Sequence, residues 1–240
     1  MGKNSGIEWT NHTWNPWQGC IKVSPGCKHC YMYRDKKRYG QQPAVVVRSS
    51  RTTFRKPLTW KEPAKVFTSS WTDFFIEQAD EWRDEAWEII RQTPHLTYQI
   101  LTKRPENIKD RLPDYLEWGD GWPNVWLGVS VESPEYLWRI VAIEDIPAAI
   151  KFVSYEPALA PVDFYPYSPV IDWIISGGES GPNFRPANPD WFRQVRDDCQ
   201  KYGIAYFHKQ NGGNRKINGV WGGNLLDGRT WQQFPEMEMA

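Results

Sequence analysis

The sequence lacks any long apolar run. A membrane-spanning helix needs about 18 consecutive apolar residues, and no stretch of this chain approaches that length. The first residues, MGKNSGIEWTNHTWNPW, also lack the apolar core of a secretory signal. Internal repeats and low-complexity segments are missing as well. We therefore expect a cytoplasmic protein with reduced thiols and no membrane partner.

Cysteine is scarce, yet three of the four cysteines stand close together in GCIKVSPGCKHCY. In a reducing compartment such clusters indicate metal ligands or catalysts rather than disulfides. Two chemistries fit Cys20, Cys27 and Cys30. One is a zinc ion, with His12 or His29 as the fourth ligand. The other is a [4Fe–4S] cluster held by three thiolates, which leaves one iron open to another ligand.

Acidic residues are few at the start of the chain. Residues 1–65 contain 13 Lys and Arg but 3 Asp and Glu, whereas residues 66–240 contain 16 and 26. The basic part includes VVVRSSRTTFRKP, whose mixture of cations and hydroxyls suits phosphate contacts. The alternative is a solvated basic face. The 15 tryptophans are similarly open to two interpretations, a heavy core or base stacking, and the core is favoured.

Short apolar runs alternate with helical patterns along the rest of the chain, which predicts a parallel α/β fold. The expected strands are residues 13–19, 65–70, 97–102, 125–132, 150–157, 171–180 and 204–210. The expected helices are residues 29–40, 77–93, 105–112, 133–146 and 188–203. We therefore predict a partial parallel (β/α) barrel of about six to seven strands. It is expected to be a single domain over residues 1–240, with a C-terminal extension at 211–240.

Most of the predicted strands end in polar or charged residues. In α/β barrels the active site forms at the carboxyl ends of the strands. Six polar strand ends therefore favour an active site at this edge over the ordinary polar loops that any such fold has. The first strand would place the three cysteines on the same edge. The polar residues at these ends are Ser69, Ser70, Asp73, Thr102, Lys103, Arg104, Ser130, Glu132, Ser154, Glu156, Ser176, Glu179, His208, Lys209 and Gln210.

Several long stretches resemble a phage-associated three-cysteine-motif family, long known as a domain of unknown function and viewed as similar to radical S-adenosylmethionine (SAM) enzymes. The matching stretches are IEWTNHTWNPWQGCIKVSPGCKHCY, VFTSSWTDFF, ILTKRPE, WLGVSVES, FVSYEPAL, DWIISGGESGPNFRP, YFHKQNGG and LLDGRTWQQFP. Two features depart from the expected patterns. The cysteines are spaced C-x6-C-x2-C instead of C-x3-C-x2-C, and Ile76 replaces an expected histidine.

The resemblance implies a [4Fe–4S] cluster on the three cysteines, SAM as cofactor and an external one-electron reductant. It implies an enzyme of a bacterial cell or phage-infected host, and we expect it to rearrange or modify a nucleic-acid base or nucleotide-linked group. Roles are carried over by position. Tyr31 is expected at the adenine, and Ser69, Ser70 and Asp73 are expected at the SAM amino group. Lys103 and Arg104 are expected at the SAM carboxylate or a phosphate, and Glu132 or Glu156 at the ribose. Gly177, Gly178 and Glu179 are expected to form a loop that lets the backbone approach the cofactor closely. Lys209 and Glu156 are the expected catalytic residues.

Two rival interpretations remain open from the sequence. The chain could be a zinc-stabilised nucleic-acid-binding or nuclease-like protein, in which Asp73, Glu132, Glu156 and Glu179 bind Mg²⁺. It could also be a catalytically inactive binding partner. Neither the substrate nor the oligomeric state follows from the sequence.

Overall fold

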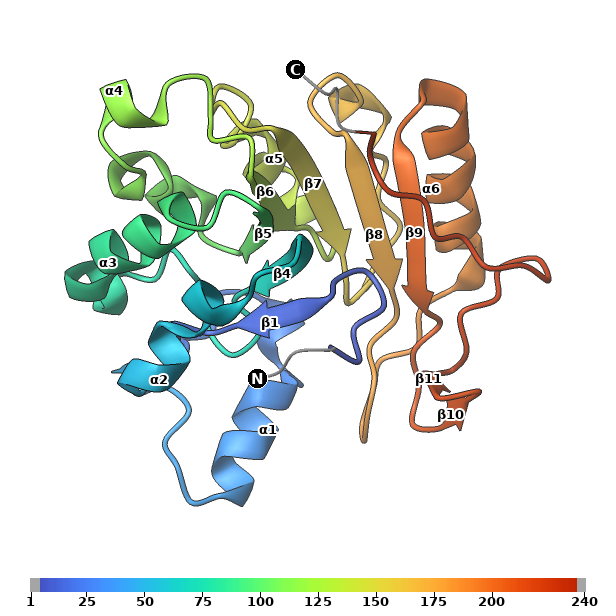
Figure 1. The fold of residues 1–240 in the computed structure, drawn as a ribbon. Coiled ribbons are helices and arrows are strands. Elements are labelled where there is room, and N and C mark those ends of the chain that lie inside the picture. Colours follow the sequence, from blue (N-terminus) through green and yellow to red (C-terminus); the bar gives the residue numbers. More distant parts are fainter. Residues whose placement is uncertain (1–4, 237–240) are drawn as a thin grey trace. The chain divides into compact units, whose positions relative to one another are not determined.

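The computed structural model describes residues 5–236, which group into two compact units. Unit 1 consists of the described residues up to Gly128 together with Asp145–Ala149, and unit 2 consists of Val129–Glu144 and the described residues from Ile150 onward. The division falls inside one strand, β6 (Val125–Ser130). The two units are described separately below, and Figure 1 labels their elements.

Unit 1 is built on parallel strands in the order β1-β4-β5-β6. The strands β1 (His12–Trp14), β4 (Ala64–Thr68) and β5 (Leu96–Thr102) are in register, with His12 opposite Val66 and Ala64 opposite Leu96. Val66, Tyr98 and Ile100 are fully buried, as expected for parallel strands covered on both faces. The sequence therefore located β4 and β5 correctly from their β-branched and aromatic content.

The expected first strand, residues 13–19, is divided in the structure. Its start forms β1, and its end forms β2 (Trp17–Gln18), which pairs antiparallel with β3 (Val47–Arg48). Proline interrupts the strand because it has no N–H to donate to a neighbour, and Pro16 contributes its carbonyl to the Ser49 N–H instead. The chain then reaches the cysteines from a short antiparallel ribbon.

The helices of unit 1 are α1 (Tyr31–Arg38), α2 (Arg51–Phe54), α3 (Asp80–Arg91) and α4 (Tyr115–Trp118). A 3₁₀ turn, Glu77–Ala79, precedes α3, which buries Ala86, Trp87 and Ile90. The prediction of a helix over residues 105–112 was wrong in type, because this segment forms two 3₁₀ turns, Pro105–Asn107 and Lys109–Arg111.

Unit 2 carries the parallel strands β7 (Ile150–Tyr155), β8 (Trp173–Gly177) and β9 (Ala205–Gln210) in sequence order. The long helix α6 (Pro189–Tyr202) contacts β8 and β9 and begins and ends as predicted. The Asn188 side chain accepts a hydrogen bond from the Asp190 N–H at its start, and Gly203 adopts a left-handed conformation with φ 71° at its end.

The helix expected over residues 133–146 is much shorter in the structure. A 3₁₀ turn, Pro134–Tyr136, leads into the single-turn α5 (Trp138–Val141). Two further short strands, β10 (Lys216–Ile217) and β11 (Val220–Trp221), form a hairpin that was not predicted. The chain then returns to the sheet, where the His208 N–H donates to the Trp231 carbonyl and the Gln233 N–H to the Tyr206 carbonyl.

Most tryptophans contribute to the cores of the two units, which supports the packing interpretation. The buried ones are Trp9, Trp14, Trp17, Trp60, Trp87, Trp118, Trp126, Trp173 and Trp231. In unit 1, for example, Trp87 packs edge-on against Trp118 and Phe74, with ring centroids 5.6 and 5.0 Å apart. Within residues 5–236 no helix has both the length and the apolar character needed to cross a bilayer.

A buried hydrogen-bond chain occupies the core of unit 2. The fully buried His208 contacts Ser176 Oγ through Nδ1 at 2.9 Å and Asn211 Oδ1 through Nε2 at 3.0 Å. Ser176 Oγ also lies 2.7 Å from the Tyr206 hydroxyl. Burial lowers the pKa of His208 to about 4, against a smaller opposing contribution from the Asn211 hydrogen bond. The imidazole is therefore neutral in the folded protein at physiological pH.

His208 should make the protein less stable in mild acid. Between the folded pKa of about 4 and the unfolded value of about 6.5, the unfolded chain binds a proton that the folded chain does not, so stability falls as the pH is lowered. From pH 7 to pH 5 the expected loss is about 2 kcal/mol. Urea unfolding at both pH values measures it. His208→Gln should remove this pH dependence, whereas His95→Gln should retain it; an equal dependence in all three proteins would contradict the assignment.

Candidate functional site

The three cysteines lie in unit 1 on the segment that joins β2 to α1. Cys20 follows β2, Cys27 ends the 3₁₀ turn Pro25–Cys27, and Cys30 is the N-cap of α1. Gly19 fixes the start of this segment. Its φ is +102°, and a Cβ there would lie 2.2 Å from the Val45 carbonyl oxygen, so the close approach excludes any side chain.

The three thiols are half-buried and lie within electrostatic reach of one another. The pKa of Cys20 is raised to about 12, first by burial and then by the nearby Asp73 and Cys27, while Arg104 opposes the shift. Burial also raises the pKa of Cys30, and Cys27 again adds to the shift. Bare thiolates are therefore disfavoured here, and a bound metal would have to displace the protons.

The donor set fits a metal–sulfur group, although its side chains are not arranged for ligation. Within residues 5–236 no group of three or more His, Cys, Asp or Glu side chains could hold a metal ion as placed. His12, a candidate fourth ligand for zinc, is already engaged by other residues. Its Nδ1 lies 2.9 Å from the Asn11 carbonyl, and the centroid of its ring lies 4.5 Å from that of Trp60. Three cysteine thiols on one short segment are the donor set of a cluster that leaves one iron open.

Asp73 organises the surroundings of the thiols. One carboxylate oxygen accepts hydrogen bonds from Thr102 Oγ1 at 2.6 Å and the Phe75 N–H at 3.1 Å. The other accepts from the Lys103 N–H at 2.9 Å and Arg104 Nη1 at 3.3 Å. Both Asp73 and Arg104 are almost fully buried. The carboxylate expected at the SAM amino group is therefore already occupied by groups of the chain.

Arg104 connects this carboxylate to the cysteine segment. Its Nη2 donates to the Ile21 carbonyl at 2.7 Å, and its Nη1 lies 3.7 Å from Cys20 Sγ. Arg104, expected at the SAM carboxylate or a phosphate, is thus placed as a group that positions Cys20. Lys103 is a further nearby cation, and its charge weakly opposes the burial that raises the pKa of Cys30.

The loop after β4 lies against the start of α1 and of the cysteine segment. The Tyr31 hydroxyl donates to the Ser70 carbonyl at 2.6 Å, and Thr72 Oγ1 donates to the Gly19 carbonyl at 2.6 Å. Ser70 Oγ contacts Asn15, whereas Ser69 Oγ is buried without a hydrogen-bond partner among the described residues. An orphaned buried hydroxyl is costly, which identifies Ser69 as a candidate ligand contact.

The predicted catalytic pair, Glu156 and Lys209, is brought together in unit 2. Lys209 Nζ lies 2.7 and 2.9 Å from the two carboxylate oxygens of Glu156. Gln210 Nε2 donates to Glu156 Oε1 at 3.0 Å and to the Gly178 carbonyl at 2.9 Å. A Cβ on Gly177 would lie 3.1 Å from the Glu156 carboxyl carbon. The Gly177–Gly178 turn therefore allows this ion pair to pack closely.

The other two candidate carboxylates of unit 2 are held by arginines. Glu132 is fully buried and pairs with Arg139 at 2.8 Å. Glu179 accepts hydrogen bonds from the Arg185 N–H at 2.8 Å and Nε at 2.9 Å. These pairings disfavour Glu132 as a ribose ligand, and they disfavour both residues as magnesium ligands.

Four side chains that hold the predicted residues of the two units were not predicted from the sequence. They are Asn15, Arg139, Arg185 and Gln210, which contact Ser70, Glu132, Glu179 and Glu156 respectively. Gln210 was noted as a polar strand end but not as a site residue. An arginine seven or six residues after a strand-end glutamate, as in Glu132–Arg139 and Glu179–Arg185, is the signal that would have revealed two of them.

A family model described as protein of unknown function (DUF5131) matches residues 4–235. The chain belongs to this family. The match covers the cysteine segment, the strands of both units and the β10–β11 hairpin. No curated protein and no solved structure matches the chain.

The Glu132–Arg139 pair provides a stability prediction. Arg139→Met removes the guanidinium that pairs with the fully buried Glu132 carboxylate, and breaking such a buried pair costs about 3–5 kcal/mol. Glu132→Gln combined with Arg139→Met removes the charge and should recover much of this loss. Urea unfolding of the two variants and the parent measures both effects. Unchanged stability in Arg139→Met would show that the pair is not formed in solution.

Proposed function

We propose that this chain is a radical SAM enzyme that modifies or rearranges a base or nucleotide-linked group of a nucleic acid. The observation that carries the proposal is the segment of unit 1 that carries Cys20, Cys27 and Cys30 close to Lys103 and to the loop of Ser69, whose buried hydroxyl has no partner among the described residues. The parallel strands of both units agree with the partial barrel expected for such enzymes.

In this proposal Cys20, Cys27 and Cys30 hold a [4Fe–4S] cluster. When bound, and with an electron from an external reductant, such a cluster supplies the chemistry that splits SAM into methionine and a 5′-deoxyadenosyl radical. Arg104 and Asp73 position the Cys20 side of the segment through the contacts described above. They therefore act on the thiols and not on SAM.

SAM contacts are assigned to Ser69, Lys103 and Tyr31. Ser69 Oγ offers a hydrogen bond to the SAM amino or carboxylate group, because no described residue uses it. The Lys103 ammonium supplies positive charge for the carboxylate. The Tyr31 ring is 43% exposed while its hydroxyl is held by Ser70, so the ring can lie against the adenine.

In unit 2 we assign proton handling to Glu156 and Lys209. The carboxylate accepts two donors, and the Lys209 ammonium is less buried than the arginines that hold Glu132 and Asp73. An ion pair that retains solvent access can release or accept a proton at Nζ or Oε when a substrate displaces one partner. Gln210 keeps the carboxylate oriented during that exchange.

The zinc-stabilised, nuclease-like alternative receives less support. Its expected magnesium ligands are Asp73, Glu132, Glu156 and Glu179, but the first, second and fourth are paired with arginines and Glu156 is paired with Lys209.

Anaerobic reconstitution with iron and sulfide tests the cluster. We expect about four irons per chain, a brown colour, and 5′-deoxyadenosine on addition of SAM and dithionite. Cys27→Ala should lose all three, while Cys199→Ala, which changes a buried cysteine of α6, should retain them. One zinc per chain with no cluster would refute the proposal. A cluster without SAM cleavage, in the presence of nucleic acid, would favour the inactive partner.

Ser69→Ala separates a ligand contact from a structural one. Because the hydroxyl has no partner in the described chain, its removal should leave thermal stability unchanged or slightly higher. If it binds SAM, the dissociation constant should rise about fivefold to tenfold, which corresponds to about 1 kcal/mol. Calorimetric titration of the reconstituted protein with SAM measures this. A clear loss of stability with unaltered SAM affinity would show that Ser69 is structural.

A further inference from the structure

The β10–β11 hairpin of unit 2, residues 211–223, has no part in the chemistry proposed above. Its sequence, NGGNRKINGVWGG, contains two cations and no acidic residue. Lys216 pairs with Trp221 and Ile217 with Val220 across an Asn218–Gly219 turn, in which both residues have positive φ (50° and 85°). This is the geometry of a tight two-residue hairpin turn, so the tip is a defined structure.

Glycine contacts fix the base of the hairpin to the ends of β8 and β9. A Cβ on Gly178 would lie 2.1 Å from the Asn211 carbonyl oxygen, and one on Gly212 would lie 2.6 Å from the Glu179 carbonyl oxygen. The Gly213 N–H donates to that same Glu179 carbonyl at 2.8 Å. The hairpin is thus held against the strand ends that carry Glu179 and Lys209.

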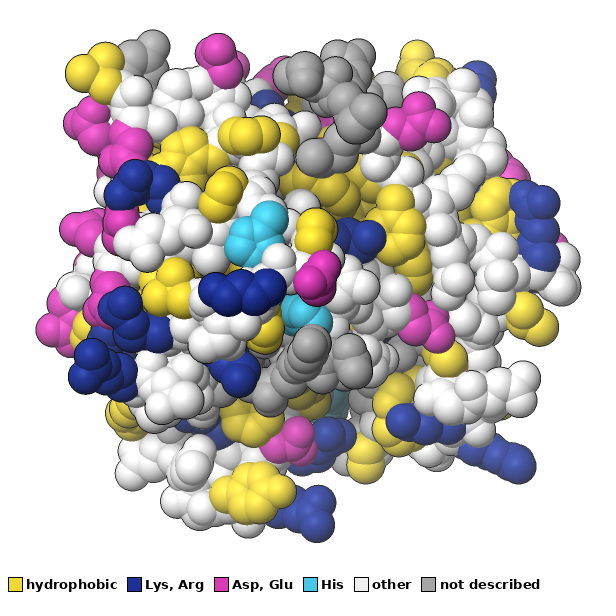
Figure 2. Space-filling model, in the orientation of Figure 1, with side chains coloured by type: hydrophobic (Ala, Val, Ile, Leu, Met, Phe, Trp, Pro, Cys, Tyr) yellow, Lys and Arg dark blue, Asp and Glu magenta, His cyan; other side chains and the backbone are white. Residues whose placement is uncertain are grey.

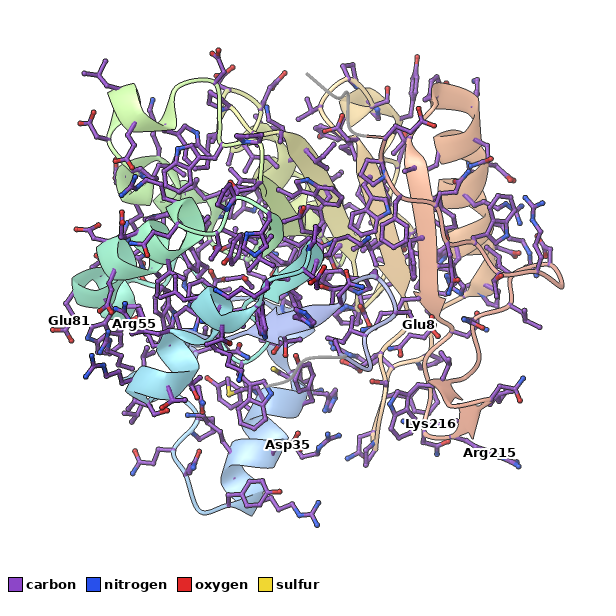
Figure 3. The ribbon with its side chains drawn as sticks, in the orientation of Figure 1. Glu8, Asp35, Arg55, Glu81, Arg215 and Lys216 are labelled. Carbon is purple, nitrogen blue, oxygen red and sulfur yellow. The ribbon has the colours of Figure 1, made fainter. Side chains whose placement is uncertain are left out.

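The outer part of the hairpin presents a cationic and apolar surface. Arg215 and Lys216 are exposed, and Figure 3 shows both side chains extending from the hairpin. Ile217 is 53% exposed, and Lys216 Nζ lies 5.3 Å from the centre of the half-buried Trp221 ring. Within the part of the chain that the structure describes, neither cation forms an ion pair. Figure 2 shows Lys and Arg side chains gathered over this hairpin.

We propose that the hairpin binds the sugar–phosphate backbone of the nucleic-acid substrate. Arg215 and Lys216 would contact phosphates, and Ile217 and Trp221 would contact sugar or base surfaces, the combination that backbone-tracking proteins use. Charge complementarity selects a polyanion, and the rigid connection to β8 and β9 gives a bound strand a fixed position relative to Glu156 and Lys209. This inference rests on the proposed function and names its recognition element.

Fluorescence anisotropy with a labelled mixed-sequence oligonucleotide, as a single strand and as a duplex, tests the proposal. The variant is Arg215→Gln with Lys216→Gln. The matched control, Lys201→Gln with Arg229→Gln, removes two exposed cations of the same unit. We expect the variant to bind about tenfold more weakly than the parent. Because two phosphate contacts are lost, the slope of log affinity against log salt should become less steep by about 1.4 for the single strand or about 1.8 for the duplex. The control should match the parent.

Equal salt slopes for the variant and the parent would overturn the proposal, as would an equal loss in the control. A loss confined to anionic phosphatidylserine vesicles, with oligonucleotide binding unchanged, would also overturn it in favour of a membrane surface. Because binding is measured without SAM or reductant, its outcome is independent of SAM cleavage. A hairpin that binds DNA in a chain that makes no 5′-deoxyadenosine would support this inference while the proposed chemistry fails.

Discussion

The buried Asp73 carboxylate is the constraint on which the cysteine segment depends. Removing a carboxylate and a guanidinium from water is expensive and is tolerated only where other hydrogen bonds satisfy both groups. Asp73 meets this condition through Thr102, Phe75 and Lys103, and Arg104 meets it through the Ile21 carbonyl. The hydrogen bond from Arg104 to the Ile21 carbonyl also holds the six-residue segment between Cys20 and Cys27 at its first residue. This segment is three residues longer than the C-x3-C spacing of radical SAM enzymes, yet its start is fixed.

Because Arg104 makes these contacts, it cannot also serve as a freely available ligand group.

The same principle separates the carboxylates of unit 2. Glu132 is enclosed with the buried Arg139, and Glu179 is held by three donors of the half-buried Arg185, so changing the charge of either carboxylate would disrupt these pairings. Glu156 differs because its partners are a lysine and an amide, and its side chain keeps 19% of its exposure. A lysine is a compact donor that gives up its proton far more readily than an arginine. These differences are the reason that the proposed function places proton handling in unit 2 at Glu156 and Lys209.

Strand positions could be predicted because they depend on local composition. Short β-branched and aromatic runs marked β4 to β9, and Asn188 and Gly203 marked the ends of α6. Pro16, which divides the expected first strand, and the 3₁₀ turns after Pro105 show where local rules gave the wrong length or type. The roles of strand-end residues were harder to predict. Whether Asp73 meets a ligand or Arg104 depends on contacts between residues 31 positions apart, and the polar strand-end pattern carries no information about that choice.

The C-terminal segment packs against the strands of unit 2. Residues 231–233 return to β8 and β9, where Trp173 Nε1 donates to the Gln233 carbonyl and Phe207 pairs with Gln232. The hairpin between β9 and this return must lie close to the strand ends. The glycines at 178, 212 and 222 permit this, since a Cβ on Gly222 would lie 1.9 Å from the Gly212 carbonyl oxygen. In the proposed function, the cations of this hairpin have a fixed position relative to Lys209, which is the condition for a backbone contact to position a base for reaction.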